Sequence, residues 1–428
     1  MKVLILTLLF LAAYAKHETY IGWKSFFVEP ATTEQLQALH GITGTYELDF
    51  LSHPTVGREG VTLVKPQYIE TFTKYLDEQA IPYRIHADDV KKQLDYDDYL
   101  IEAKNNASIR TGGRLMPYDN YQPLSVIYEY MDYIAATYPQ TVTMVTPANS
   151  FHGRPIKYLK ISTTNFEDAR KPVIFIDGGI HAREWISPPS VTWAIHKLVE
   201  DITEPDLLQN FDWIILPVVN PDGYDFTFTD TRFWRKTRST DQSPIGSLCP
   251  GVDGNRNYDF FFGTVGISNS PCAETFPGRR AFSEVETRVV RDIMFEHLDR
   301  IALYLTIHSY GSMILYPWGH NGSLSSNALL LHAVGVAMAQ AIDALSLPNF
   351  PNYVVGNAVP VLGYGTSGSA EDYAHLIGVP LAYTYELPGL GWGTAGFHLD
   401  PIYINQVVRE TWAGYVAGAR RAGELFRR

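Results

Sequence analysis

The sequence predicts an α/β fold for its larger part, preceded by a small α+β segment. From about residue 115 onward, short apolar runs alternate with amphipathic stretches. Such alternation is typical of a sheet whose strands are joined by helices. The chain has 428 residues, of which 46% are hydrophobic and 19% charged. This composition is that of a globular protein large enough to bury an extensive core.

The first 15 residues have the pattern of a secretion signal. Lys2 is followed by the apolar run Val3–Leu11 and by Ala13-Tyr14-Ala15, a small-residue cleavage pattern. No later stretch reaches the roughly 20 apolar residues that a membrane helix needs. The net charge of -12 argues against nucleic acid and anionic membranes as partners. We therefore expect a secreted protein that binds neither.

Residues 16 to about 105 predict a small α+β unit. The alternating run Tyr46–Phe50 indicates a strand, and Gln67–Gln79 has helical spacing. A polar link from Lys104 to Arg114 follows, where Arg110 and Arg114 would suit a trypsin-like protease. A flexible interdomain linker is the alternative interpretation. The expected organisation is residues 1–15, 16–114 and 115–428.

Buried strands and amphipathic helices are predicted along the large domain. The strands are expected at Val173–Asp177, Trp213–Val219, Ile301–Ile307 and Pro380–Leu387. The helices are expected after Pro188-Pro189, around Asn327–Leu345 and around Asn405–Leu425. We find no internal repeat, so these elements predict one α/β domain.

Two local signals add boundaries to this domain. Asn220-Pro221-Asp222-Gly223 follows the second strand and is interpreted as a turn. Ser283 and Glu286 have the spacing of a capping box, which would place Ser283 at the head of a helix.

The chain contains two cysteines, Cys249 and Cys272. In an oxidising compartment such a pair normally forms a disulfide, and a loop of this length would contribute on the order of 3 kcal/mol to stability. A metal site that uses both thiols is the alternative, although the sequence lacks the Cys-x-x-Cys spacing typical of structural zinc. We predict the disulfide.

His181-Ala182-Arg183-Glu184 directly follows a strand and a Gly-Gly turn, where α/β sheets present ligand-binding residues. A His and a Glu three residues apart can face one metal. His308 also ends a buried strand. Two histidines and one glutamate leave zinc an open fourth position, as catalytic zinc sites require.

These residues carry a family resemblance. His181-x-x-Glu184, His308-Ser309-Tyr310 and Tyr385-Glu386-Leu387, together with Asp253-Gly254-Asn255-Arg256-Asn257, resemble the funnelin-type zinc metallocarboxypeptidases, the pancreatic carboxypeptidase A and B family. The resemblance covers nearly the whole chain and is strongest to insect digestive enzymes of the B type. It implies a mixed, mostly parallel central sheet flanked by helices, with residues 16–114 as an activation prosegment that covers the cleft until it is cut.

The resemblance implies one Zn²⁺ per catalytic domain, bound by His181, Glu184 and His308. Glu386 would be the general base, a carboxylate near the metal that takes a proton from water and delivers it to the leaving amine. Arg235 would stabilise the negative charge that develops on the substrate carbonyl.

The remaining site residues are also carried over from the family. Asn255, Arg256 and Tyr364 match the clamp on the terminal carboxylate of the substrate, for which an arginine offers a planar fork. Asp253 matches an acid that orients a zinc-bound histidine. Arg183 matches a contact further from the cleaved bond. After the base the sequence departs from the family pattern, reading Leu387-Pro388-Gly389-Leu390-Gly391-Trp392.

Glu371 falls where the family sets specificity for the terminal side chain. A carboxylate there favours a cationic guest, so the expected substrates end in Lys or Arg. The longer Glu in place of the B-type Asp favours Lys over the bulkier Arg. If Glu371 turned outward or paired internally, an A-type preference for apolar or aromatic termini would follow.

Other functions fit the sequence less well. A relative that binds C-termini without cutting them would usually lack a ligand or the base, and all are present here. A serine hydrolase would need a Gly-x-Ser-x-Gly elbow and a zincin a His-Glu-x-x-His motif, and the sequence contains neither. The expected partners are peptide and protein C-termini, an activating trypsin-like protease and protein inhibitors. We expect a monomer that acts in the gut lumen.

Overall fold

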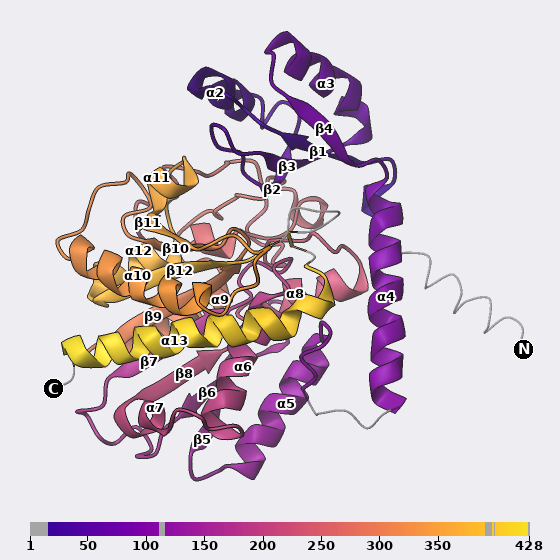
Figure 1. Cartoon of the computed structure of the whole chain (residues 1–428). Helices are drawn as coiled ribbons and strands as arrows, with labels where there is room; N and C mark the ends of the chain where they lie inside the picture. The colour runs from indigo at the N-terminus through magenta and orange to yellow at the C-terminus, as the bar shows by residue number, and fades with distance from the viewer. Residues whose placement is uncertain (1–15, 111–115, 390–395, 398, 427–428) are drawn as a thin grey trace, which may run out of the picture. The chain divides into compact units, whose positions relative to one another are not determined.

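The chain divides into two compact units (Figure 1). The computed structural model describes residues 16–110, 116–389, 396–397 and 399–426. The first unit comprises residues 1–112, Phe226–Trp234 and Gly391–Gly396; the second comprises Gly113–Asp225, Arg235–Leu390 and Phe397–Arg428. The predicted secretion signal, Arg114, and Leu390–Trp392 of the segment that departs from the family pattern lie outside the described residues.

An antiparallel sheet of order β2-β3-β1-β4 forms the first unit with its helices. Its strands are β1 (Lys24–Val28), β2 (Asp49–Ser52), β3 (Gly60–Val64) and β4 (Tyr83–Ala87). Its short helical elements are η1 (Glu18–Tyr20), α2 (Thr33–Gly41), η2 (Pro66–Tyr68) and α3 (Ile69–Glu78). Phe72 and Leu76, four residues apart on α3, are fully buried against Phe26 of the sheet. The prediction of a small α+β unit is confirmed.

The polar link is shorter than predicted, because α4 (Val90–Arg110) includes most of it. Two features favour this long helix. Lys91 and Asp95 form an i,i+4 ion pair of 2.7 Å. Leu94 and Ile101 are buried on one side of the helix. The packing of these apolar residues extends the helix through a sequence whose composition alone reads as a linker.

Within the described residues, the second unit is built on an eight-stranded sheet of order β11-β10-β12-β9-β7-β8-β6-β5. Its strands are β5 (Val142–Asn149), β6 (Pro155–Ile161), β7 (Val173–Gly178), β8 (Asp212–Leu216), β9 (Ile301–Ser309), β10 (Met313–Tyr316), β11 (Val354–Asn357) and β12 (Leu381–Leu387). The central strands β8, β7, β9 and β12 run parallel, and so do β10 and β11. Strands β5, β6 and β10 pair antiparallel with their neighbours β6, β8 and β12. The predicted mixed, mostly parallel sheet is confirmed.

Helices cover the sheet of the second unit. They are α5 (Leu124–Thr137), α6 (Ser187–Val199), α7 (Pro205–Asn210), α8 (Pro221–Thr229, which continues into the first unit), α9 (Val285–Glu296), α10 (Ala328–Asp343), α11 (Ala358–Leu362), α12 (Ala370–Ile377) and α13 (Ile404–Phe426). The short 3-10 turns are η3 (Gly246–Leu248), η4 (Gly254–Arg256) and η5 (Pro401–Tyr403). Every residue of β7, β8 and β9 is buried, which explains their near-continuous apolar sequences.

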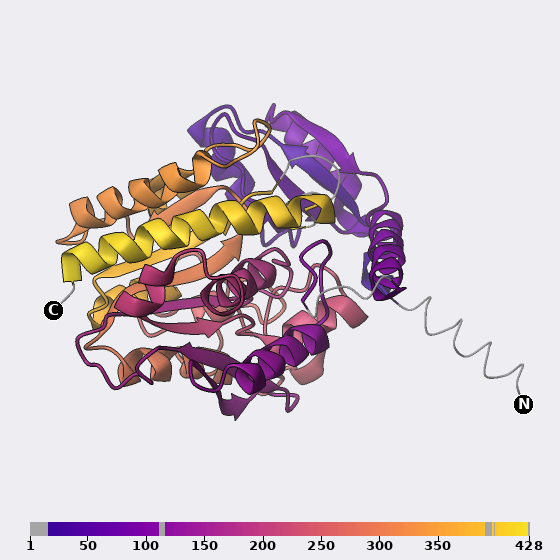
Figure 2. The same cartoon turned by 60° about the horizontal axis from the view of Figure 1, so that its bottom comes forward.

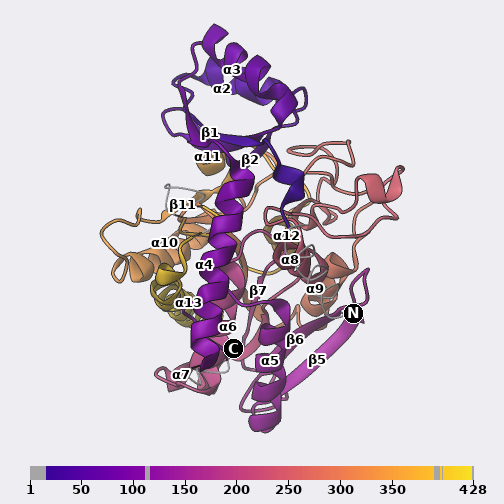
Figure 3. The same ribbon diagram turned by 90° about the vertical axis from the view of Figure 1, so that its right-hand side faces the viewer.

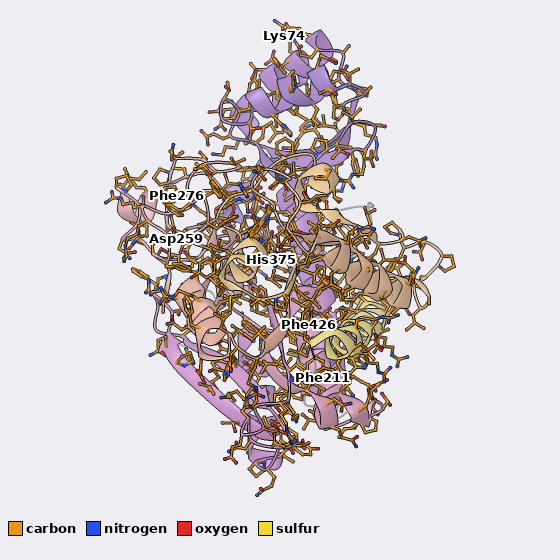
Figure 4. The ribbon with its side chains drawn as sticks, turned by 90° about the vertical axis from the view of Figure 1, so that its left-hand side faces the viewer. Lys74, Phe211, Asp259, Phe276, His375 and Phe426 are labelled. Carbon is orange, nitrogen blue, oxygen red and sulfur yellow. A yellow bond between two sulfur atoms is a disulfide. The ribbon has the colours of Figure 1, made fainter. Side chains whose placement is uncertain are left out.

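The long helix α13 packs beside α10 and α6 on one face of the sheet (Figure 2). Helix α5 lies along β5 and β6 (Figure 3). Helices α9 and α12 instead pack with residues of β7 and β9 in one hydrophobic core cluster. In Figure 4, His375 marks α12 and Phe426 marks the end of α13, and side chains fill the layers between these helices and the sheet. The sheet is therefore enclosed by helices, as in other α/β proteins.

Two predicted boundaries are wrong. Strand β8 ends at Leu216, because Pro217 has no N–H to donate to a ladder. The segment interpreted as a turn begins helix α8 instead. Asn220 caps this helix by accepting a hydrogen bond from the Gly223 N–H at 2.9 Å, and Pro221 occupies its first turn. Asn and Pro suit a helix start as well as a turn, which is why the local signal was ambiguous.

The predicted capping box is also wrong. Helix α9 begins at Val285 with Glu284 as its N-cap residue. The Ser283 hydroxyl donates to the Glu284 carboxylate at 2.8 Å, and the Glu286 side chain is buried. Ser283 also accepts from the Asn257 amide at 2.9 Å, whereas Glu286 Oε1 has no hydrogen-bond partner among the described residues, so the reciprocal bonds of a capping box do not form.

The strand predicted at Tyr46–Phe50 begins at Asp49 instead, because Tyr46 and Glu47 lie in a turn. Strands β7, β9 and β12 and helices α6, α10 and α13 begin or end within a few residues of the predicted ranges. Cys249 and Cys272 form the predicted disulfide. None of the helices in the described residues combines the length and apolar character needed to cross a bilayer.

Candidate functional site

Three buried side chains converge at the ends of two neighbouring parallel strands. His181 and Glu184 lie in the loop that joins β7 to α6, and His308 is near the end of β9. His181 Nδ1 lies 2.7 Å from Glu184 Oε1, and His308 Nδ1 lies 3.0 Å from Glu184 Oε2. The two Nδ1 atoms are 3.1 Å apart. The side chains therefore face one common point.

The loop is fixed by a close approach of backbone and side chains. Gly179 has a φ of 67°, a conformation that favours glycine. A Cβ at Gly178 would lie 2.5 Å from Ser187 Oγ. The Ser187 hydroxyl accepts from the Gly179 N–H at 3.1 Å and donates to the Ile307 carbonyl at 2.6 Å. This hydroxyl thus connects the His181 loop to the strand that carries His308.

The donor set fits a zinc ion. The candidate ligand atoms of His181, Glu184 and His308 all lie within 4.8 Å of one another. Zinc bonds of about 2.0–2.1 Å place tetrahedral ligand atoms roughly 3.3 Å apart, close to the separations seen here. Burial and the charge of Arg235 lower the pKa of His181, which favours the neutral imidazole that metal binding requires. The site would hold zinc with three protein ligands.

Asp253 lies behind His181 and orients its ring. Its Oδ1 is 3.0 Å from His181 Nε2, so a proton held between these two atoms leaves His181 Nδ1 free toward the common point. Burial raises the pKa of the Asp253 carboxyl, but Arg235 and His181 outweigh this effect and hold the pKa well below its usual range. Asp253 therefore stays ionised as a firm acceptor.

Arg235 is held beside the same centre. Its Nε and one terminal nitrogen donate to Asp253 Oδ2 at 3.1 and 2.9 Å. Its other terminal nitrogen lies 4.0 Å from Glu184 Oε1. The guanidinium is therefore a fixed positive charge next to the three converging side chains.

Glu386 lies on β12 in direct register with His308 on β9. Its carboxyl is not one of the three converging groups. Burial raises its pKa to about 8, and the negative charge of Glu184 adds to the rise. A bound divalent cation would favour the ionised form. The structure thus places a buried carboxyl group beside the candidate metal centre.

Asn255 and Arg256 occupy η4, next to Asp253. The turn is fixed because the Asn255 N–H donates to Asp253 Oδ1 at 3.0 Å. Asn255 Oδ1 accepts from the Ala370 N–H at 2.8 Å. Arg256 donates to the carbonyls of Asn255 and Gly266 at 2.7 and 3.0 Å. Backbone contacts thus hold both side chains in place.

Tyr364 lies in the loop between α11 and α12 and is partly exposed. Burial raises the pKa of its phenol, while Arg256 lowers it and Glu386 raises it through their charges. These interactions place the phenol within electrostatic range of both groups.

Glu371 is buried in the first turn of α12. Its Oε2 has no hydrogen-bond partner among the described residues. Its charge acts on both His308 and Glu386, which places it in the same region. The neighbouring Asp372 serves another purpose, since both of its oxygens accept from the Gly319 N–H at 2.8 and 2.9 Å.

Arg183 is buried between the two predicted ligands of the loop, and its guanidinium lies 4.6 Å from the ring centre of Phe397. The disulfide residues Cys249 and Cys272 belong to the surrounding loops and are not part of the converging set.

Asn220 is a structural residue of this site that the sequence interpretation missed. Its amide donates to the carbonyls of Ile180 and Lys236 at 3.2 and 2.9 Å. It therefore links the His181 loop to the segment that follows Arg235. A helix-cap interpretation of Asn220-Pro221 was available from the sequence, but no local pattern identifies such distant carbonyl partners.

Comparisons with known proteins agree with this geometry. A family model described as zinc carboxypeptidase matches residues 127–414, and one described as carboxypeptidase activation peptide matches residues 26–97. The chain is 66% identical over 429 residues to carboxypeptidase B of Helicoverpa zea, with 100% of both chains covered.

Two solved structures are also similar. Carboxypeptidase A from Helicoverpa armigera has a TM-score of 0.91 at 45% identity, covering 95% of this chain and 99% of that one. Bovine thrombin-activatable fibrinolysis inhibitor, solved in complex with tick carboxypeptidase inhibitor, has a TM-score of 0.65 at 30% identity, covering 72% of this chain and 99% of that one.

The family match spans more than half of the chain, and the buried His-Glu-His set fits the zinc that this family binds. The chain belongs to the zinc carboxypeptidase family and carries that family's activation peptide, which makes it the zymogen of a zinc metallocarboxypeptidase.

Proposed function

We propose that this zymogen is secreted, that residues 16–114 form its prosegment, and that the domain of residues 115–428 releases single Lys or Arg residues from peptide C-termini. The observation that carries the specificity is the buried Glu371 carboxylate, whose Oε2 lacks a hydrogen-bond partner among the described residues. A buried carboxylate is stabilised best by a cation, which the terminal side chain of the substrate would supply.

His181, Glu184 and His308 would hold the zinc. When bound, zinc supplies a Lewis acid that polarises the scissile carbonyl and makes water acidic enough to attack near neutral pH. Glu386, in register with His308, would accept the proton of the attacking water and transfer it to the leaving amine. The two carboxylates have separate roles in this assignment. Glu184 would bind the zinc, and Glu386 would transfer the proton.

The cationic side chains would position the substrate. Arg235, which hydrogen bonds to Asp253 hold in place, would stabilise the negative charge that develops on the scissile carbonyl oxygen. Arg256 and Asn255 would receive the terminal carboxylate together with the Tyr364 hydroxyl. Arg183, on the zinc-binding loop, would contact the substrate further from the cleaved bond.

The names of the relatives bear on specificity. The sequence relative described above is called carboxypeptidase B, whereas the more similar of the two solved structures is called carboxypeptidase A. An A-type preference for apolar termini is therefore the second candidate. Glu371 favours the B-type assignment, because an apolar guest would leave its carboxylate without a cation.

The proposed partners follow from the same assignment. Peptide and protein C-termini would be the substrates, and a trypsin-like protease that cuts after Arg110 or Arg114 would activate the zymogen. A protein inhibitor is a further proposed partner, because a related structure was solved in complex with a tick carboxypeptidase inhibitor. We propose that the enzyme acts as a monomer in the gut lumen.

Glu386→Gln tests the catalytic assignment. The variant should bind zinc as the unmodified protein does but lose at least about 10²-fold in kcat on a peptide ending in Lys, since general acid–base catalysis contributes about 10²–10⁴-fold. Zinc content and single-residue release would be measured on trypsin-treated protein. The control is Glu424→Gln on the exposed end of α13, which should change neither.

Two outcomes would contradict the proposal. Near-normal turnover of Glu386→Gln would exclude Glu386 as the base. Failure of the unmodified, trypsin-treated protein to release any residue would favour a relative that binds C-termini without cutting them.

A further inference from the structure

A column of buried polar side chains leads away from the zinc site along one face of the sheet. Tyr304, Thr306 and His308 alternate along β9 and therefore point to the same face. Asp177 on β7 is paired in register with Thr306. All four side chains are buried, with exposed fractions of 0–1%. Polar groups at such depth need hydrogen-bond partners.

His308 uses its two ring nitrogens differently. Nδ1 faces Glu184 and His181, whereas Nε2 points back along the column and lies 3.4 Å from Thr306 Oγ1. Since Nδ1 must be unprotonated to bind a metal, the ring proton of a zinc-bound His308 would reside on Nε2. The Thr306 oxygen is placed to accept that N–H.

Asp177 lies beside Thr306, its register partner on the neighbouring strand. Burial raises the pKa of Asp177 to about 6, and the hydrogen bond from the Tyr304 hydroxyl opposes this rise. The Tyr304 hydroxyl donates to Asp177 Oδ2 at 2.6 Å. Asp177 Oδ1 has no hydrogen-bond partner among the described residues, so it can accept from the Thr306 hydroxyl on the neighbouring strand. A threonine hydroxyl that donates to this carboxylate would present its oxygen lone pair to the imidazole N–H.

We propose that Thr306, supported by Asp177 and Tyr304, is a positioning residue for His308 that fixes the ring orientation in which Nδ1 faces the zinc. This inference deepens the proposed zinc site and rests on His308 as a ligand. The arrangement corresponds to that of Asp253 behind His181, with a hydroxyl inserted between the carboxylate and the ring.

The inserted hydroxyl has a chemical consequence. Asp253 contacts its histidine directly and carries a full negative charge, which Arg235 balances. A carboxylate in the place of the Thr306 hydroxyl, in direct contact with His308 Nε2, would add negative charge next to the metal and weaken it as a Lewis acid. The neutral Thr306 hydroxyl orients the ring without adding negative charge next to the metal.

The test compares zinc affinities measured by competition with a chelator in the intact zymogen. Thr306→Val removes the hydroxyl at nearly constant volume, and Thr306→Ser retains it. The matched control is Thr384→Val on β12, because Thr384 is in register with Thr306, is buried, and has a hydroxyl without a partner among the described residues. The zinc-free proteins would also be unfolded thermally to separate loss of affinity from loss of stability.

Loss of an outer partner of a metal ligand typically weakens metal binding about 10–100-fold. We expect a loss of this size in Thr306→Val, near-normal affinity in Thr306→Ser and in Thr384→Val, and no further loss when Asp177→Asn is added to Thr306→Val, since the two residues act through one contact. Affinity of Thr306→Val within threefold of the unmodified protein would overturn the proposal, as would an equal loss in Thr306→Ser or in Thr384→Val.

His308→Ala separates this inference from the proposed function on which it rests. Loss of zinc from His308→Ala together with normal affinity in Thr306→Val would reject only the role of Thr306. Normal zinc affinity in His308→Ala would reject the zinc-site assignment itself.

Discussion

At the scale of single residues, the adjacent acids Glu371 and Asp372 of α12 differ in their hydrogen-bond partners. Asp372 is occupied, because both of its oxygens accept from the Gly319 N–H. Glu371 next to it is also buried, yet its Oε2 has no hydrogen-bond partner among the described residues. A buried carboxylate oxygen without a hydrogen-bond partner destabilises the free enzyme. This is expected of a group whose partner is a charged ligand.

The first prediction concerns the terminal residue that the enzyme removes. Glu371→Gln keeps the shape of the side chain but removes its charge, so kcat/KM for peptides ending in Lys should fall on the order of 10²-fold, as expected when one partner of a buried ion pair is lost. Values for peptides ending in Phe or Leu should stay the same or rise. The measurement is kcat/KM for the four peptides ending in Lys, Arg, Phe and Leu.

Glu371→Asp is the matched variant, since it retains the charge on a side chain shorter by one methylene. It should keep the preference for basic residues and shift it from Lys toward Arg, because the guest gains room. An unmodified enzyme that prefers Phe or Leu would show that the A-type alternative is correct.

At the scale of elements, the start of helix α9 carries an acid in an unusual environment. A carboxylate in the first turn of a helix normally gains about 0.3–1 kcal/mol from the helix dipole. Glu286 has that position, but burial and the negative charge of Glu284 raise its pKa to about 8. Burial therefore outweighs the dipole, and the carboxyl is protonated in the folded protein at neutral pH.

The second prediction is a pH dependence of stability. An unfolded chain ionises this glutamate near pH 4.3–4.5. Between that pH and about 8 the folded state binds more protons than the unfolded state, so the free energy of unfolding should fall as pH rises, by up to about 1.4 kcal/mol per pH unit from this group. Above about pH 8 its contribution should become constant.

Glu286→Gln should remove this contribution, so the variant gains stability relative to the unmodified protein as pH rises from 5 to 8. Urea unfolding of both proteins at several pH values, with zinc in excess, measures the difference. The exposed Glu424→Gln should show no such trend. A constant difference between Glu286→Gln and the unmodified protein across this range would mean that the carboxyl is already ionised at pH 5.

At the scale of the whole molecule, the activation peptide is joined to the catalytic domain through helix α4, which ends at Arg110. Proteases cut helices poorly, because the substrate chain must be extended in their active sites. The proposed cut falls at this helix end, after Arg110, or after Arg114, which lies outside the described residues.

The third prediction is that activity requires this cut. The uncut zymogen should be nearly inactive on a small synthetic substrate, and trypsin should raise its activity. Replacing Arg110 and Arg114 together by Ala should prevent activation, whereas Arg58→Ala, an exposed basic residue of the first unit, should have no effect. The readouts are substrate turnover and the N-terminal sequence of the product. Full activity of the uncut chain would exclude inhibition by residues 16–114.

Much of the fold follows from local patterns. The buried strands β7, β9 and β12 could be located because their apolar runs are uninterrupted, and α10 and α13 because their apolar residues recur at helical spacing. The errors lie where a local signal has two meanings. Asn220-Pro221 reads as a turn or as a helix start, and the charged stretch before Arg110 reads as a linker or as a helix. Long-range contacts decide such cases.

The sequence by itself determined the family, because His181-x-x-Glu184, His308 and Glu386 stand at strand ends in an order that identifies it. Their chemistry is a property of residue type and could be inferred without coordinates. Only the tertiary structure decided which distant residues support them. The link from Ser187 to Ile307 and the column from Asp177 to His308 join residues more than 100 positions apart. No local pattern records such pairs, because sheet pairing brings them together only after distant strands have met.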